Sequence, residues 1–130
     1  MKPTLEDYDD QVAIKCPHCG DAYLHHDEVR VFERAEGSVT KMCVTVRGMD
    51  AETVGDQPQE PRFPTVRVDD CMTGNPSGRR QGVEVGMWCE NCRMRSQFRI
   101  VQHKGMTFLS IERTQYEMKA VEAAGGSRPS

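Results

Sequence analysis

The fold of this chain is decided by two short stretches, Cys16-Pro17-His18-Cys19-Gly20 and Trp88-Cys89-Glu90-Asn91-Cys92. In each stretch two residues separate a pair of cysteines, and a tight turn of that length directs both thiolates toward one ion. Two such turns supply the four tetrahedral ligands that Zn²⁺ prefers. The sequence therefore predicts a structural Zn²⁺ cofactor bound by Cys16, Cys19, Cys89 and Cys92.

The surroundings of the two pairs predict a zinc ribbon with an insertion. Gly20 follows the first pair, where such a turn often requires a positive φ. Arg93 stands at the matching position after the second pair, which predicts slight strain or a different geometry there. The 69 residues between Cys19 and Cys89 exceed the usual ribbon interval of about 15 to 20 residues. The ribbon must therefore contain an inserted β segment.

A redox site is the alternative reading of the first pair. Cys-Pro-His-Cys is also an active-site sequence of strongly oxidising thioredoxin-like oxidoreductases, in which a helix N-terminus stabilises the first thiolate. Here Gly20 and Asp21 follow at once, and no βαβ pattern surrounds the motif. The second Cys-x-x-Cys pair also favours metal binding over redox chemistry.

The remaining cysteines and the histidines give no second strong signal. Cys43 in an apolar strand and Cys71 after a strand are interpreted as small buried side chains. The alternative is a second metal site that they form with a histidine. His25 and His26 are interpreted as surface residues near a bend, because adjacent strand residues face opposite sides. We find no phosphate loop, no nucleophile elbow and no convincing paired carboxylates, and four cysteines close a zinc site. We therefore expect no catalytic residue and no enzyme activity.

The alternation of apolar and polar residues predicts a mostly β fold. We expect strands at residues 23–33, 39–47, 65–70, 83–89, 96–102 and 106–113, with the first two forming a hairpin. Three segments follow: a flexible acidic lead-in at 1–15, a single zinc-ribbon β domain at 16–113, and a short helix with a disordered tail at 114–130. The insertion, a β-hairpin or meander, occupies residues 34–82.

Composition limits the size of the core and the cellular location. The chain has 130 residues, six cysteines and 6% aromatic residues, so its core is modest and a metal would matter. No run approaches the roughly 20 apolar residues of a membrane helix, and the acidic N-terminus has no apolar stretch of a secretory signal. We expect a cytoplasmic protein, where cysteines stay reduced or bind metal.

Charge is unevenly distributed along the chain. Residues 1–70 hold eight basic and fifteen acidic residues, a net of −7, whereas residues 71–130 hold nine and five, a net of +4, which together give −3. Such asymmetry can indicate an anion-binding face, but two solvated surfaces of opposite sign are the favoured explanation, because the cations do not form a dense basic run. The candidate anion or partner contacts are Arg79, Arg80, Arg93, Arg95, Arg99 and Lys104.

Several motifs follow one another along the chain in the same order as in small zinc-ribbon proteins of actinobacteria and their bacteriophages, which the chain therefore resembles. The resemblance covers roughly residues 14–113, and its motifs are moderately specific. It rests on Cys16-Pro-His-Cys-Gly, Tyr23-Leu-His-His, Val31-Phe-Glu-Arg, Asn75-Pro-Ser-Gly-Arg-Arg, Trp88-Cys-Glu-Asn-Cys and Gln102-His-Lys-Gly-Met-Thr. The family has no assigned activity, so the resemblance implies a phage-type origin and zinc at the four cysteines, and supplies no catalytic residue.

Two functions remain open from the sequence. The first is a non-enzymatic, regulatory zinc-ribbon adaptor that binds a host or phage protein, in the host cytoplasm if a phage encodes it. The alternative is a nucleic-acid-binding zinc ribbon that uses the basic residues around the second cysteine pair. Against the alternative stand the net negative charge and the scarcity of aromatic residues for stacking on bases.

Overall fold

The chain folds as an all-β protein in the part that the structure describes. The structure is a computed structural model, and it describes residues 1–36, 38–48 and 64–114. This part contains no helix, and therefore no helix that could cross a membrane. Its strands are β1 (Leu5–Tyr8), β2 (Gln11–Ile14), β3 (Leu24–Arg34), β4 (Lys41–Arg47), β5 (Thr65–Asp69), β6 (Gly82–Cys89), β7 (Arg95–His103) and β8 (Met106–Arg113).

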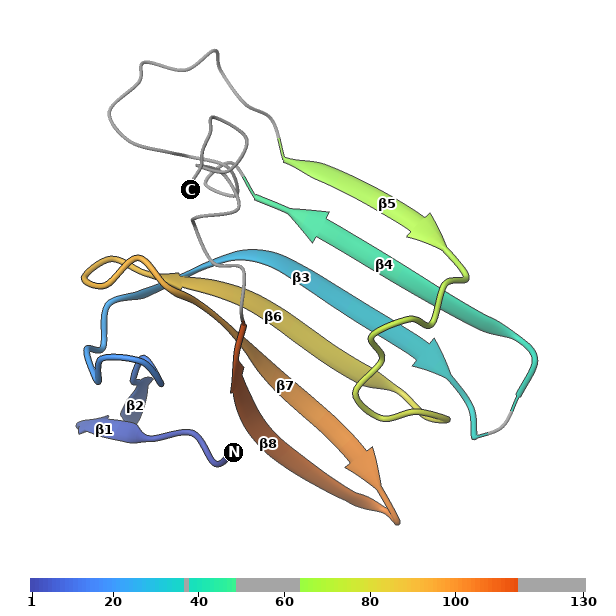
Figure 1. Cartoon of the computed structure of the whole chain (residues 1–130). Helices are drawn as coiled ribbons and strands as arrows, with labels where there is room; N and C mark the ends of the chain where they lie inside the picture. The colour runs from blue at the N-terminus through green and yellow to red at the C-terminus, as the bar shows by residue number, and fades with distance from the viewer. Residues whose placement is uncertain (37, 49–63, 115–130) are drawn as a thin grey trace.

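Six of the strands form one antiparallel sheet in the order β5-β4-β3-β6-β7-β8 (Figure 1). The central neighbours, β3 and β6, are far apart in the sequence, and each adjoins one cysteine pair. Leu24 at the start of β3 pairs with Cys89 at the end of β6. This pairing brings the two cysteine turns to the same end of the sheet.

The predicted mostly β class is confirmed, and so is the alternation that predicted it. Each of the six expected strands lies within two residues of an observed one, and β3 pairs with β4 as expected. Residues 34–82 hold β4, β5 and the loop 70–81, and the connection between β4 and β5 lies largely outside the described residues. The helix expected in residues 114–130 also falls outside them, apart from residue 114.

Residues 1–15, expected to be a flexible lead-in, contain a two-stranded hairpin instead. β1 pairs with β2 from Leu5↔Ile14 to Tyr8↔Gln11, so only two residues form the turn. Asp9 takes a φ of +53° in this turn, which suits a tight hairpin because aspartate tolerates the left-handed region better than most residues. The strands were missed because acidic residues dominate β1 and mask its alternation.

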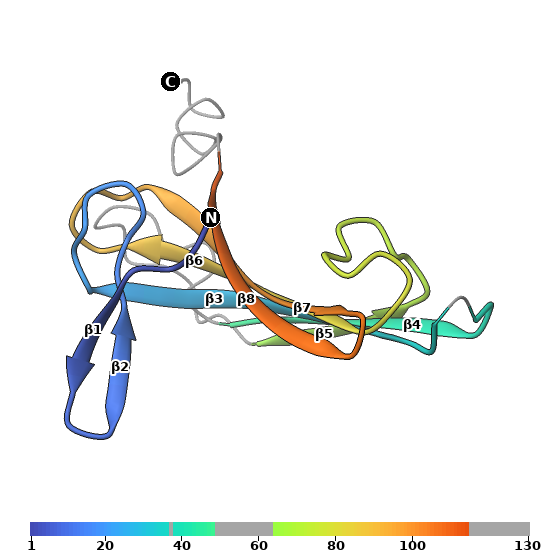
Figure 2. The same cartoon turned by 90° about the horizontal axis from the view of Figure 1, so that it is seen from below.

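The two faces of the large sheet differ in what covers them. Figure 2 shows the sheet nearly edge-on, with the loop 70–81 on one side and the β1–β2 hairpin on the other. The face under the loop carries an ionic network, in which Glu84 of β6 lies 3.5 Å from both Arg30 and Arg99. The loop is fixed there because the carbonyl of Thr73 accepts a 2.8 Å hydrogen bond from Arg30.

The opposite face, which we call the apolar face, is continuous across all six strands. The registers place these side chains directly opposite one another, as in Val29↔Val85, Val85↔Phe98 and Val44↔Val68. The apolar face consists of Val29, Val31, Met42, Val44, Val46, Val66, Val68, Val83, Val85, Phe98, Ile100 and Leu109.

Much of the apolar face lies open. Val66, Val68 and Leu109 are 67%, 59% and 51% exposed. Burial on this side is complete only near the cysteines, where Met87 and Ile111 are buried.

Candidate metal centre

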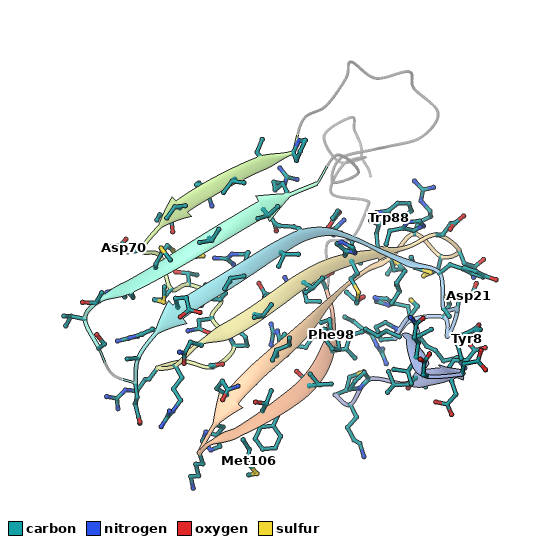
Figure 3. All side chains as sticks on the ribbon, turned by 180° about the vertical axis from the view of Figure 1, so that it is seen from behind. Tyr8, Asp21, Asp70, Trp88, Phe98 and Met106 are labelled. Atoms are coloured by element: carbon teal, nitrogen blue, oxygen red, sulfur yellow. The ribbon has the colours of Figure 1, made fainter. Side chains whose placement is uncertain are left out.

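The four cysteines of the two Cys-x-x-Cys motifs converge at one end of the sheet. Cys16 and Cys19 lie in the turn after β2, Cys89 ends β6, and Cys92 lies in the turn before β7. Their four Sγ atoms are all within 4.8 Å of one another. Trp88, next to Cys89, marks this end of the sheet in Figure 3.

The sulfur positions fit a tetrahedral metal. A Zn–S bond of about 2.3 Å implies S···S separations near 3.8 Å in a regular tetrahedron. The Sγ atoms of Cys16 and Cys92 are 3.7 Å apart, and those of Cys19 and Cys89 are 3.6 Å apart. Each of these short distances joins one cysteine of the first turn to one of the second. A single ion bound here would therefore connect the two turns.

The two turns have the same backbone geometry. Gly20 donates a 2.9 Å hydrogen bond to the carbonyl of Cys16, and Arg93 donates one of 2.9 Å to the carbonyl of Cys89. Both donors are in the left-handed region, with φ of +85° at Gly20 and +66° at Arg93. Arg93 therefore adopts the conformation expected of the usual glycine, at a cost of about 1–2 kcal/mol for a residue with a Cβ. Its guanidinium lies 5.6 Å from the Trp88 ring, and that cation–π contact offsets part of the cost.

Hydrogen bonds and burial set the acidity of the thiols. The side-chain amide of Asn91 lies 3.6 Å from Cys19 Sγ and lowers the pKa of that thiol to about 7. Burial raises the pKa of Cys92 to about 12 and also raises the pKa of Cys89. A metal ion must therefore displace protons from the more buried thiols, because thiolates are the ligands.

A buried ion pair next to the cysteine turns joins β3 to β7. Asp27 lies at an irregularity in the β3–β6 pairing, and its Oδ1 is 2.8 Å from Nη2 of Arg95. The carbonyl oxygen of Arg95 lies 2.9 Å from Nε2 of His18, which stands between the two cysteines of the first turn. His18 therefore joins the first turn to β7.

A stacked cluster covers the second turn, and sequence reasoning missed it. The rings of His25 and Trp88 lie 4.5 Å apart at 15°, and His25 is 3.0 Å from Glu90. The register places His25 opposite Trp88, whereas the adjacent His26 pairs with Met87 and is exposed. The two histidines thus face opposite sides, as strand geometry requires.

The six candidate cations do not form one surface. Arg95, Arg99 and Arg80 are paired with Asp27, with Glu84 and Glu112, and with Glu36 respectively. Arg93 lies over Trp88 at the cysteine end. Arg79 precedes β6 and Lys104 follows β7, so both are exposed at the other end of the sheet.

Three other cations lie beside the cysteines and were not singled out from the sequence. Lys2, Lys15 and Arg113 help to line a hollow of about 380 Å³ that also includes Cys16 and Cys19. These residues come from the two ends of the described chain, and no local pattern links them. The backbone hydrogen bonds between Met1 and Ile111 of β8 bring the two ends together.

The two remaining cysteines have different environments. Cys43 is buried on β4, with its Sγ 3.9 Å from the Thr45 hydroxyl. Cys71 is exposed, which corrects its interpretation as a buried side chain, and hydrogen bonding by Thr73 lowers its pKa. Across the described ranges, the four-cysteine cluster is the one group of three or more ligand side chains close enough to hold a metal. A second site formed by Cys43, Cys71 and a histidine is therefore not seen there.

Comparisons with known proteins add no relative. The chain matches no protein-family model, and searches of the curated proteins and of the solved structures find no significant match. The resemblance to zinc-ribbon proteins of actinobacteria and their phages therefore stays a prediction.

Proposed function

We propose that this chain is a non-enzymatic zinc-ribbon adaptor, in which Zn²⁺ fixes one end of a sheet whose apolar face binds another protein. Zinc is the metal that four thiolates in a tetrahedral arrangement favour. Four protein ligands leave no coordination position for a substrate, so the metal would stabilise the fold and not catalyse a reaction.

The open apolar face is the observation that carries the proposal. An antiparallel sheet normally packs one face on a core and leaves the other in water. Here the face in water is apolar across six strands, whereas the polar face is covered by the loop 70–81. Contiguous exposed apolar patches of this kind mark interaction sites.

Nucleic-acid binding is the weaker candidate on the same geometry. Affinity for a phosphate backbone comes from free cations aligned on one surface. Arg80, Arg95 and Arg99 already have carboxylate partners, and Arg79 and Lys104 lie far from Arg93. A host or phage protein as the partner, and a regulatory role in the cytoplasm, follow from the resemblance alone.

Metal analysis tests the zinc half of the proposal. We expect one zinc per chain and four thiols protected from an alkylating reagent. Cys19→Ser should lose the metal, whereas Cys71→Ser, at an exposed cysteine outside the cluster, should keep it. A disulfide between Cys16 and Cys19 in the purified protein would contradict the assignment.

Affinity capture from a lysate of the producing organism tests the binding half. Val46 is 38% exposed on the apolar face, and Val39 is 87% exposed in the turn between β3 and β4. Val46→Lys should lose bound protein, and the matched control Val39→Lys should retain it. Equal capture by both variants would show that the apolar face is not the binding surface.

A further inference from the structure

We propose that the protein bound by the apolar face is a second copy of this chain, packed face to face as a two-layer β-sandwich. The proposal rests on the proposed function, because it assigns the occupant of the same surface. The two sheets would lie about 10 Å apart, as sheets in sandwiches do.

The chemistry of the face fits a copy of itself. A two-fold dimer places the same patch against itself, so the patch must be self-complementary. The twelve side chains of the apolar face carry no charge, and nine of them are β-branched valine or isoleucine. Glu33, which the register places opposite Met42 on the same side of the sheet, is charged and exposed, so two copies would have to pack with both Glu33 carboxylates in water at the rim of the interface. The ionic network of Arg30, Glu84 and Arg99 would stay on the outside of both layers.

The size of the whole sheet reaches what a stable dimer needs. An interstrand spacing of about 4.8 Å makes the six-stranded sheet roughly 24 Å wide, and about six residues of roughly 3.3 Å each make it about 20 Å long. The product is about 480 Å² for each copy of the sheet, or about 1,000 Å² for both, which is the lower limit for a specific interface. Most strands contribute two side chains to the apolar face, so the interface reaches this limit only when it also includes the polar margin of the sheet. Side-chain relief makes the accessible area larger than this flat projection.

Beyond the described ranges, the chain offers half as many large apolar side chains as the apolar face holds. The segments outside the described ranges longer than one residue, 49–63 and 115–130, hold six large apolar side chains, against twelve on the apolar face. Residues 49–63 also hold four acidic residues. The six are Met49, Val54, Phe63, Tyr116, Met118 and Val121.

The fold leaves the face open for a second sheet except at one end. The β1–β2 hairpin lies on the apolar side of the sheet (Figure 2). Met87 and Ile111 are 5% and 1% exposed at the cysteine end of β6 and β8, whereas Leu109, two residues away on β8, is 51% exposed and Val66, on the far edge strand β5, is 67% exposed. Burial at the cysteine end therefore extends along β8 only as far as Ile111. A partner sheet would pack on the exposed side chains beyond it.

Light scattering coupled to size exclusion, with dilution series by analytical ultracentrifugation, tests the proposal on the zinc-loaded full chain. We expect a dimer of twice 14.7 kDa. Val46→Lys buries two unpaired charges in the dimer and should raise its Kd at least 100-fold. Val39→Lys, the matched control in an exposed turn, should leave Kd within about twofold. Unchanged zinc content and circular dichroism in both variants would show that they fold.

Isotope-filtered NMR distinguishes a face-to-face dimer from other arrangements. Mixed dimers of labelled and unlabelled chains should show contacts between methyl groups of Val44, Val85 and Leu109 across the interface. Contacts confined to β5 or β8 would instead indicate edge pairing and would overturn the proposal.

The remaining outcomes separate this proposal from the proposed function. A monomer at millimolar concentration that binds the apolar dye bis-ANS, with binding lost in Val46→Lys, would overturn the self-dimer and keep the apolar face open for a different protein. A monomer that binds phosphatidylcholine vesicles through this face would make a lipid surface the occupant. A monomer that binds neither would overturn both proposals.

Discussion

Replacing Asp27 with asparagine should lower the free energy of unfolding by about 2–3 kcal/mol. The carboxylate of Asp27 is 1% exposed, and its Oδ1 lies 2.8 Å from the Arg95 guanidinium. A hydrogen bond to a charged group contributes about 1.5–3 kcal/mol, and breaking a buried pair costs about 3–5 kcal/mol. Arg95 is 23% exposed, so water partly solvates the guanidinium left behind, and asparagine keeps one acceptor oxygen. The expected cost therefore lies near the lower end.

Urea unfolding of the zinc-saturated protein measures this cost. The measurement is made at one protein concentration and at neutral pH, because metal binding and self-association both shift apparent stability. Asp69→Asn is the matched control, because Asp69 pairs at 3.3 Å with Arg67, whose side chain is 74% exposed. Exposed pairs contribute about 0–1 kcal/mol, so the control should lose less than about 1 kcal/mol.

Equal losses of stability in the two asparagine variants, or a loss of less than about 0.5 kcal/mol in Asp27→Asn, would contradict the stabilising role of the buried pair. A double-mutant cycle with Arg95→Gln then isolates the pair from its surroundings. A coupling energy near zero would mean that the burial of Asp27, and not its contact with Arg95, accounts for any loss.

Three further predictions concern the metal, one turn and one buried carboxylate. Chelation of the metal should unfold the two cysteine turns and the β1–β2 hairpin, measured as faster amide exchange there than in β3 and β4; equal exchange throughout would show that the metal holds no local structure. Gly20→Ala should cost about 1–2 kcal/mol in thermal unfolding because φ is +85° there, whereas Gly48→Ala, which would meet only an ordinary 3.7 Å contact, should cost less; equal losses would contradict the turn geometry. Burial raises the pKa of Glu84 above 4.5, so the folded protein holds a proton that the unfolded chain releases, and stability falls as pH rises from 4.5 through the folded pKa. In urea titrations Glu84→Gln should be as stable as the wild type below pH 4.5 and more stable at neutral pH, with Glu112→Gln, at a half-exposed carboxylate, as the control. A variant less stable than the wild type at neutral pH would show that attraction to Arg30 and Arg99 stabilises the charged carboxylate more than burial destabilises it.

Local patterns predicted the strands and the cysteine turns because both depend on short spacings. The alternation of Val83, Val85 and Met87 identified β6 from its own residues, and the two Cys-x-x-Cys pairs identified the four cysteines that cluster in the structure. The pairing of β3 with β6 could not be read this way, since more than forty residues separate the two strands. Asp27, the partner of Arg95, lies on β3 and is brought there by that pairing, whereas the partners of Arg99 lie on the neighbouring strands β6 and β8. The sequence therefore overstated how much free positive charge the second half of the chain presents.

The alternation of residues could not predict which face of the sheet is covered. A strand with a period of two has one apolar and one polar face, but the pattern does not say which one the fold covers. In this chain the loop 70–81 covers the face with the Glu84 ion pairs, so most of the valines lie outward. Within one copy only a few apolar side chains are buried, among them Phe32, Met87 and Ile111. A sheet so thinly packed needs stabilisation from elsewhere, because folding of a small domain is opposed by its chain entropy. A metal at the cysteine end and a second sheet on the apolar face would both stabilise the same folded state, so losing either one should weaken binding of the other.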